Sequence, residues 1–290
     1  MKVIYNPTAG RRRAILLWRV LDILAANGVK VDLSETLCAG HATTLAQEAV
    51  SRGSGLVVAA GGDGTIAEVA NGLMGSAAHL GIIPLGTANV LAHELALPFA
   101  PRSVAAALAF GRTRRIWPGI VRQDHTTRLF VQMVGVGFDA HVVHTLSASL
   151  KRIFGRGAYV IQTLTQLMKY DFDPIFVRLD GIETQAASVI VSKGRLYGGP
   201  YRLTADQDPG EDGFTVVLFD HGGPGMTLLY GAALPLNLLG KAPGVRHVRA
   251  RRVEFIGNRP VPVQADGDMA GWLPIMISSA PAPIQVVIGS

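Results

Sequence analysis

A chain of 290 residues is long enough for about two domains, and its 49% hydrophobic and 17% charged residues exclude an intrinsically disordered protein. The net charge of +6 is supplied mostly by arginine, with 21 Arg and 6 Lys, and favours contact with phosphate or an anionic surface. The single cysteine, Cys38, excludes an internal disulfide framework and fits a reducing compartment, so we expect a cytoplasmic protein.

The first hundred or so residues alternate between strand and helix patterns. Short apolar runs are typical of strands buried on both faces, and apolar residues at helical spacing are typical of helices that pack on a sheet. The predicted strands are residues 2–5, 29–33, 55–60 and 80–83, and the predicted helices are residues 14–26, 41–50, 89–96 and 103–110 and one that begins at residue 65. Repeated strand–helix units predict a layered, mostly parallel sheet covered by helices.

The pattern changes after Gly111, where short alternating runs predict mostly antiparallel strands. We therefore predict two domains, residues 1–118 and 119–290, with the last residues allowed to pack back on the first domain. The predicted strands of the second half are residues 128–134, 174–179, 186–191, 214–219, 253–256, 261–264 and 284–288, and helical segments lie around 146–169 and 226–239. The 226–239 segment is apolar nearly all round, which favours core packing over contact with a bilayer or an acyl chain.

The longest uncharged stretches do not predict a membrane protein. Residues 69–92 and 269–290 lack formal charges, but glycine and proline divide both stretches into pieces too short to span a bilayer. Arginine clusters at 11–13, 112–115 and 246–252 are more typical of a solvated surface than of a nucleic-acid site, because aromatic residues for base stacking make up only 7% of the chain. We therefore expect no nucleic-acid partner.

The clearest motif is GGDGT at residues 61–65, which follows a predicted buried strand and precedes a helix. Glycines at such a turn let a ligand approach the backbone, and the helix N-terminus offers unpaired N–H groups to phosphate. Residues 65–68 have the spacing of a capping box, so Thr65 and the glycines alone are explained by a helix start. A helix start does not explain Asp63, because a carboxylate beside phosphate is repulsive unless a divalent cation lies between them.

Two further turns occupy corresponding positions after predicted strands. NPTAG at 6–10 follows the first strand, and PLGTAN at 84–89 follows the strand after GGDGT. Because parallel strands end at the same edge of a sheet, such turns form one crevice and indicate a phosphate site. A Walker motif is absent, and GVGFDA at 135–140, which has dinucleotide-type spacing but no acidic residue about 20 positions later, is interpreted as a tight turn.

Two acidic turns stand out in the second half. DQDPGEDG at 206–213 fits either a solvated loop or a divalent-cation site built from a carboxylate and backbone carbonyls. In the second turn, Asp266 and Asp268 flank Gly267, which fits a hairpin or two carboxylates directed toward one site. The residues alone leave both alternatives open.

These motifs together resemble the diacylglycerol kinase catalytic family, in its bacterial lipid-kinase branch, which includes relatives of sphingosine and ceramide kinases. The resemblance covers nearly the whole chain and rests on 6–10, GGDGTIAEVANGL at 61–73, LGIIPLGTAN at 80–89, 135–140, GEDGF at 210–214 and ADGD at 265–268. Phosphofructokinases and NAD kinases share a GGDG-type turn, but PLGTAN and the last acidic turn favour lipid kinases. The fold implied is an α/β N-terminal nucleotide domain, like that of NAD kinase or phosphofructokinase, plus a β-rich antiparallel sandwich.

The resemblance implies ATP and Mg²⁺ as cofactors, with Asp63 and Asn89 helping to organise the phosphates and the metal. The residues implied to contact ATP are Asn6, Thr8, Gly10, Thr36, Gly61, Gly62, Asp63, Gly64, Thr65, Ile66, Ala67, Thr87 and Asn89.

Catalytic and metal roles in the second half also follow from the resemblance. Asp268 stands where the family usually has a glutamate proposed as general base, and Asp266 and Asp63 complete the predicted catalytic set. A structural magnesium site is implied at Asp212 with the carbonyls of Pro209 and Phe214.

The predicted function is an ATP-dependent lipid kinase with a diacylglycerol-like acceptor. Two departures from the family, the shorter Asp268 and Val90 where many members have aspartate, keep open a nucleotide-binding regulator without catalysis. A kinase of a soluble substrate, such as an NAD kinase, is the other alternative. The expected partners are a lipid substrate and the inner face of a membrane, with a homodimer left open.

Overall fold

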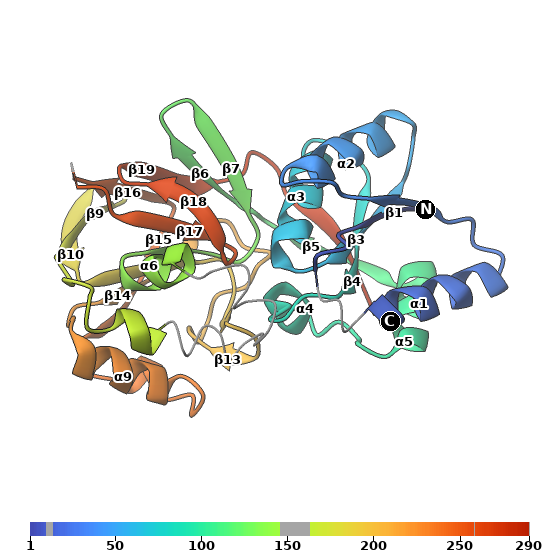
Figure 1. The fold of residues 1–290 in the computed structure, drawn as a ribbon. Coiled ribbons are helices and arrows are strands. Elements are labelled where there is room, and N and C mark those ends of the chain that lie inside the picture. Colours follow the sequence, from blue (N-terminus) through green and yellow to red (C-terminus); the bar gives the residue numbers. More distant parts are fainter. Residues whose placement is uncertain (10–13, 146–162, 258, 290) are drawn as a thin grey trace. The chain divides into compact units, whose positions relative to one another are not determined.

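The computed structural model describes residues 1–9, 14–145, 163–257 and 259–289, so Gly10 and most of the helical segment predicted around 146–169 lie outside the described residues. The chain divides into two compact units: residues 1–118 with 281–290, and residues 119–280. Each unit has its own sheets and its own hydrophobic core (Figure 1).

The first unit contains one six-stranded, mostly parallel sheet, ordered β2-β1-β3-β4-β20-β5. Only the last pair, β20 with β5, is antiparallel. The central strands are apolar and buried on both faces, which requires helices on both sides. The strands are β1 (Lys2–Tyr5), β2 (Asp32–Glu35), β3 (Leu56–Gly61), β4 (His79–Pro84), β5 (Arg112–Ile116) and β20 (Ile284–Ile288).

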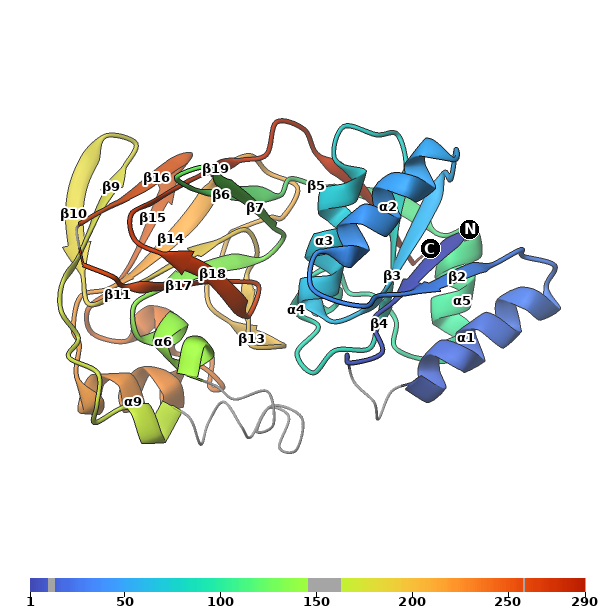
Figure 2. The ribbon, with the colours of Figure 1, turned by 45° about the horizontal axis from the view of Figure 1, so that its top comes forward.

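Two pairs of helices cover this sheet on opposite faces (Figures 1 and 2). Helices α1 and α5 share one core cluster with the sheet, to which Leu17 and Val104 contribute. Helices α2 and α3 pack closely because residue 72 is glycine; a Cβ there would lie 2.5 Å from that of Ala46. The helices are α1 (Ala14–Ala26), α2 (His41–Ser51), α3 (Asp63–Leu73), α4 (Val90–Glu94) and α5 (Pro101–Phe110). The predicted α/β fold is confirmed.

The second unit is a sandwich of two six-stranded antiparallel sheets, ordered β10-β9-β16-β19-β6-β7 and β15-β14-β11-β8-β17-β18. Its core lies between the sheets, where Val177 and Val253 of the first meet Val189 and Val216 of the second. The strands are β6 (Gly119–Gln123), β7 (Thr126–Phe130), β8 (Met133–Val136), β9 (Ile175–Leu179), β10 (Ile182–Ala186), β11 (Ser188–Ser192), β14 (Phe214–Phe219), β15 (Val245–Ala250), β16 (Arg252–Ile256), β17 (Pro262–Ala265), β18 (Asp268–Trp272) and β19 (Ile275–Ser279), with a ribbon of β12 (Leu196–Tyr197) and β13 (Tyr201–Arg202). The predicted antiparallel sandwich is confirmed.

Short helices flank the sandwich: α6 (Phe138–Thr145), α9 (Pro224–Ala233) and the 3₁₀ helix η2 (Leu239–Lys241). Within α9 only Ala233 is buried, whereas Leu228 and Leu229 of this helix and Leu236 and Leu238 beyond it are 43–66% exposed. The expectation of core packing for 226–239 is therefore wrong for these leucines. In the described part of the chain, no helix has the length and hydropathy to cross a membrane.

Candidate functional site

Three loops that follow parallel strands meet in the first unit. Asn6 follows β1 and donates a hydrogen bond from Nδ2 to Oγ1 of Thr65 at 3.0 Å. After β4, the N–H groups of Leu85 and Gly86 donate to the carbonyl of Gly61, at 2.9 and 3.2 Å. The structure thus brings together the three turns that the sequence singled out.

The turns after β3 and β4 touch through their glycines. A Cβ on Gly86 would lie 2.5 Å from the Cα of Gly62 and 2.8 Å from Oδ1 of Asn89, so no side chain fits there. Asp63 begins α3, and its Oδ1 accepts the N–H of Leu91 in α4 at 3.2 Å. The two turns thus place backbone without side chains beside a carboxylate and a helix N-terminus, the arrangement that suits a phosphate ligand.

Asn89 is the most informative polar residue of these turns. It is 1% exposed and has left-handed backbone angles, with φ 47° and ψ 50°. Its Nδ2 donates to the carbonyl of Gly86 at 2.8 Å, but among the described residues its Oδ1 has no hydrogen-bond partner. A buried polar atom left in this way costs about 1–3 kcal/mol, and oxygen donors such as Asn89 and Asp63 suit a hydrated Mg²⁺ ion.

The other predicted ATP contacts are distributed more widely. The N–H and hydroxyl of Thr8 both donate to Oδ1 of Asn6, at 3.0 and 2.7 Å, which closes the first turn. Thr36 follows β2 and donates its N–H to Tyr5 at 2.8 Å. The side chains of Ile66 and Ala67 are buried in α3, so they are not available to contact a ligand. Gly64 lies in the first turn of α3, and Thr87 lies between β4 and α4.

The capping-box interpretation of residues 65–68 is wrong. Helix α3 begins at Asp63 with Gly62 as its N-cap, so Thr65 lies inside the first turn. The carboxylate of Glu68 instead accepts N–H groups of Gly40 and Ala42 at the start of α2, at 2.8 and 3.1 Å. Glu68 thus stabilises the N-terminus of a neighbouring helix.

In the second unit, Asp266 and Asp268 have different surroundings. The carboxylate of Asp266 accepts three backbone N–H groups from the segment between β7 and β8, those of Val131, Gln132 and Met133, at 2.7, 2.9 and 3.0 Å. Asp268 begins β18, its side chain is 49% exposed, and its ion pair with Arg128 is long, at 3.8 Å. Asp266 is thus engaged by backbone, whereas Asp268 faces solvent; their predicted catalytic roles stay predictions.

A polar network that the sequence did not reveal supports this turn. Gln264 accepts the N–H of Gly267 at 2.9 Å and donates to Oδ2 of Asp139 at 2.8 Å, and the hydroxyl of Tyr197 donates to the other oxygen of Asp139. Burial raises the pKa of Asp139, and the hydrogen bonds from Tyr197 and Gln264 oppose that rise. Gly135 makes room for this carboxylate, since a Cβ there would lie 2.2 Å from it. The sequence offered only the glycine–aspartate spacing, which also fits an ordinary turn.

Gln132 is a second buried amide that lacks hydrogen bonds within the part of the chain that the structure describes. It is 1% exposed, and neither Oε1 nor Nε2 has a hydrogen-bond partner among the described residues. Its backbone N–H is one of the three that Asp266 holds. No sequence signal distinguished this glutamine.

The 206–213 turn is surrounded by positive charge. The ammonium of Lys193, a residue that the sequence analysis did not single out, donates to the carbonyls of Glu211 and Gly213 at 2.7 and 2.8 Å. A hydrogen bond from Ser279 and the charges of Arg251 and Lys193 lower the pKa of Asp212. In the described residues, no group of three or more His, Cys, Asp or Glu side chains is arranged to hold a metal ion.

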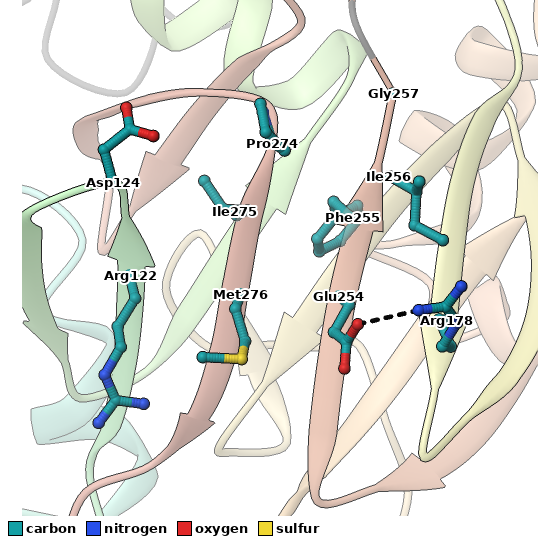
Figure 3. A pocket seen from close by; sticks show the side chains of 10 residues that line it. All are labelled: Arg122, Asp124, Arg178, Glu254, Phe255, Ile256, Gly257, Pro274, Ile275 and Met276. Carbon is teal, nitrogen blue, oxygen red and sulfur yellow. Dashed lines mark hydrogen bonds and ion pairs between the residues drawn. The ribbon is translucent and has the colours of Figure 1, made fainter.

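Figure 3 shows an open depression on the surface over β6, β9, β16 and β19. Arg178 and Glu254 form an ion pair of 3.2 Å in it, and Arg122 and Asp124 lie toward its other side. None of the predicted site residues lines it, so it carries no part of the candidate site.

Comparison with known proteins first gives the class. Residues 1–120 match the family described as "Diacylglycerol kinase catalytic domain", and residues 132–288 match the "YegS C-terminal NAD kinase beta sandwich-like domain". The two matches together place the chain in the lipid-kinase class of families.

Relatives place the chain within that class. It is 28% identical to "Diacylglycerol kinase" of Bacillus subtilis (strain 168), over 94% of this chain and 91% of the relative. It is 30% identical to "Probable lipid kinase YegS-like" of Xanthomonas euvesicatoria pv. vesicatoria (strain 85-10), over 93% and 90%. The protein belongs to the diacylglycerol kinase catalytic-domain family, together with the YegS-like lipid kinases.

A solved structure agrees with the fold. The crystal structure of a "putative diacylglycerol kinase" from Bacillus anthracis str. Sterne superposes with a TM-score of 0.80 at 21% identity, over 99% of this chain and 94% of that one.

Proposed function

We propose that this protein transfers the γ-phosphoryl group of ATP to the hydroxyl group of a diacylglycerol-like lipid. The observation that carries the proposal is the meeting of three loops around Gly62 and Gly86, with Asp63 beside them and with the oxygen of Asn89 that no described residue contacts by a hydrogen bond. Family membership supports the lipid acceptor.

The predicted site residues have separate roles in this reaction. Backbone N–H groups of the glycine-rich turns and the N-terminus of α3 would hold the phosphates. Asp63 and Asn89 would supply oxygen ligands for Mg²⁺, which would neutralise phosphate charge. Asp268 accepts the proton of the lipid hydroxyl while the hydroxyl oxygen attacks the γ-phosphorus and ADP leaves. Asp266 accepts the N–H groups of residues 131–133 and so fixes the conformation of the turn that carries Asp268.

The acceptor implies contact with a membrane. Diacylglycerol-like lipids reside in bilayers, and the stretch from His221 to Gly240 carries no formal charge while it exposes Leu228, Leu229, Leu236 and Leu238. We therefore propose that this stretch contacts the bilayer peripherally, with the protein at the inner face of the membrane.

Labelled ATP and a lipid extract provide the test. The wild-type protein with Mg²⁺ should produce a labelled lipid, identified by mass, and Asp63→Asn and Asp268→Asn should each reduce the rate at least about a hundredfold. Asparagine at position 63 still accepts the N–H of Leu91, and position 268 is half exposed, so the melting temperature should shift by less than about 2 °C. Asp22→Asn, on the exposed face of α1, is the matched control.

Other outcomes favour the alternatives. Phosphorylation of NAD instead of any lipid would identify a kinase of a soluble substrate. Stabilisation by ATP and Mg²⁺ without turnover on any acceptor would identify a nucleotide-binding regulator. Unchanged transfer in both variants would overturn the assignment of the site.

A further inference from the structure

The 206–213 turn concentrates negative charge in front of a wholly buried strand. It contains Asp206, Asp208, Glu211 and Asp212, and all six residues of β14, which begins at Phe214, are buried. The acidic side chains themselves are exposed or half-buried, but backbone carbonyls of the turn lie against the buried strand. Such carbonyls need positive charge or hydrogen-bond donors, because unpaired polar groups are costly to bury. A divalent cation is the solution that the family resemblance implies.

Lys193 already supplies a cation at this place. The residue follows β11, is 0% exposed, and donates its own backbone N–H to the carbonyl of Gln132 at 2.7 Å. Its ammonium bonds to the carbonyls of Glu211 and Gly213, the residues on either side of Asp212, and lies 5.1 Å from the ring centroid of Phe214. Two carbonyls and an aromatic face thus surround one positive charge.

Arginines neutralise the outer side of the same turn. Arg249 forms an ion pair with Glu211 at 2.5 Å and also donates to Gln207. Arg251 lies 3.9 Å from the carboxylate of Asp212. The adjacent carboxylates of Glu211 and Asp212 therefore each have a cation of the chain itself.

This arrangement does not fit a divalent ion. An ion on the carboxylate of Asp212 would lie near the guanidinium of Arg251, 3.9 Å from that carboxylate, and near the ammonium of Lys193, which bonds to the carbonyls of both residues adjoining Asp212. Like charges so close together repel.

We infer that Lys193 is the built-in cation of the 206–213 turn and replaces the structural divalent cation that the family resemblance implies at Asp212 with the carbonyls of Pro209 and Phe214. The turn is then held in place without metal. A divalent requirement of this protein would be confined to the nucleotide.

Metal dependence of the fold tests this inference at neutral pH, with neither nucleotide nor lipid present. The melting temperature of the wild-type protein should be the same in EDTA, in Mg²⁺ and in Mn²⁺, and Mn²⁺ followed by electron paramagnetic resonance should show no site that Asp212→Asn removes. A bound Mn²⁺ ion lost in Asp212→Asn, or a melting temperature that EDTA lowers in the wild type but not in Asp212→Asn, would overturn the inference. Neither result touches the proposed function, because ATP and lipid are absent.

Removal of the Lys193 ammonium tests whether this cation stabilises the turn. Lys193→Met keeps the apolar stem but leaves two carbonyls without a donor, so its melting temperature should fall by about 5–10 °C relative to Lys241→Met, an exposed lysine. An unchanged melting temperature in Lys193→Met would overturn the inference. If Lys193→Met does not fold, the wild-type and Asp212→Asn measurements decide the question alone.

Discussion

The glycine-rich turns of the first unit and the 206–213 turn of the second both carry carboxylates, but their surroundings are opposite. In the first unit the described residues leave the buried Oδ1 of Asn89 without a partner. In the second unit Lys193, Arg249 and Arg251 approach the carbonyls and carboxylates of the turn. A buried group that lacks a partner points to a ligand, whereas a group that the chain itself satisfies points to a structural role.

The largest loss of stability is expected from a change at Asp266. Asp266→Ala removes the acceptor of three backbone N–H groups, so we expect the free energy of unfolding to fall by about 3 kcal/mol and the melting temperature by about 6–12 °C. Thermal melting or chemical denaturation of the full chain measures this loss.

Asp268→Ala is the matched control for that change. Its half-exposed carboxylate has a long ion pair, which is worth at most about 1 kcal/mol, so stability should change little while phosphoryl transfer is lost. Equal loss of stability in the two variants would contradict the division of this turn into a structural and a reactive carboxylate.

A somewhat smaller effect is expected where the two glycine-rich turns touch. Gly86→Ala places a Cβ 2.5 Å from the Cα of Gly62 and 2.8 Å from Oδ1 of Asn89, so the turns must separate. Overpacking of this kind costs about 2 kcal/mol, and we expect affinity for ATP to fall at least about tenfold. Calorimetric titration with ATP and Mg²⁺ measures the affinity.

Gly55→Ala is the control for backbone effects, because its Cβ would meet no heavy atom within 4 Å. It should leave both stability and ATP affinity unchanged. If Gly86→Ala binds ATP as tightly as Gly55→Ala, these turns are not the phosphate site.

Much of the fold was predictable because burial imposes periodic patterns. The apolar run at 55–60 and the alternating runs after Gly111 gave the parallel and antiparallel sheets. The strand predicted at 29–33 lies later in the chain, as β2 at Asp32–Glu35. Lys2 of β1 stands opposite Asp32 in the strand register, and their side chains form an ion pair of 2.9 Å. Pairing of β20 with β4 and β5 depends on residues about 170–200 positions apart, which no local pattern encodes.

The candidate site was predictable only where close backbone contacts require glycine. Glycines in GGDGT and PLGTAN mark turns that carry no side chains, and the structure brings these turns together. The partners of a charged residue cannot be read locally. Lys193 and the arginines of the 246–252 cluster looked like ordinary basic residues, yet each of these arginines pairs with a carboxylate: Arg246 with Asp220, Arg249 with Glu211, Arg251 with Asp212 and Arg252 with Glu254.

The smallest change in stability is expected from a substitution of Asp139, whose carboxylate accepts hydrogen bonds from Tyr197 and Gln264. Its pKa in the folded protein is raised, so between the ordinary value and the raised value the folded chain binds more protons than the unfolded chain, and the contribution of Asp139 to stability falls as pH rises. Asp139→Asn removes this charge but loses about one hydrogen bond in the Gln264 chain, which costs about 1 kcal/mol. The variant should therefore be less stable than the wild type near pH 4, and the difference should shrink toward pH 7. Denaturation at both pH values measures this; a difference that grows with pH would mean that Asp139 is stabilised as a charged group, like the carboxylates of the 206–213 turn.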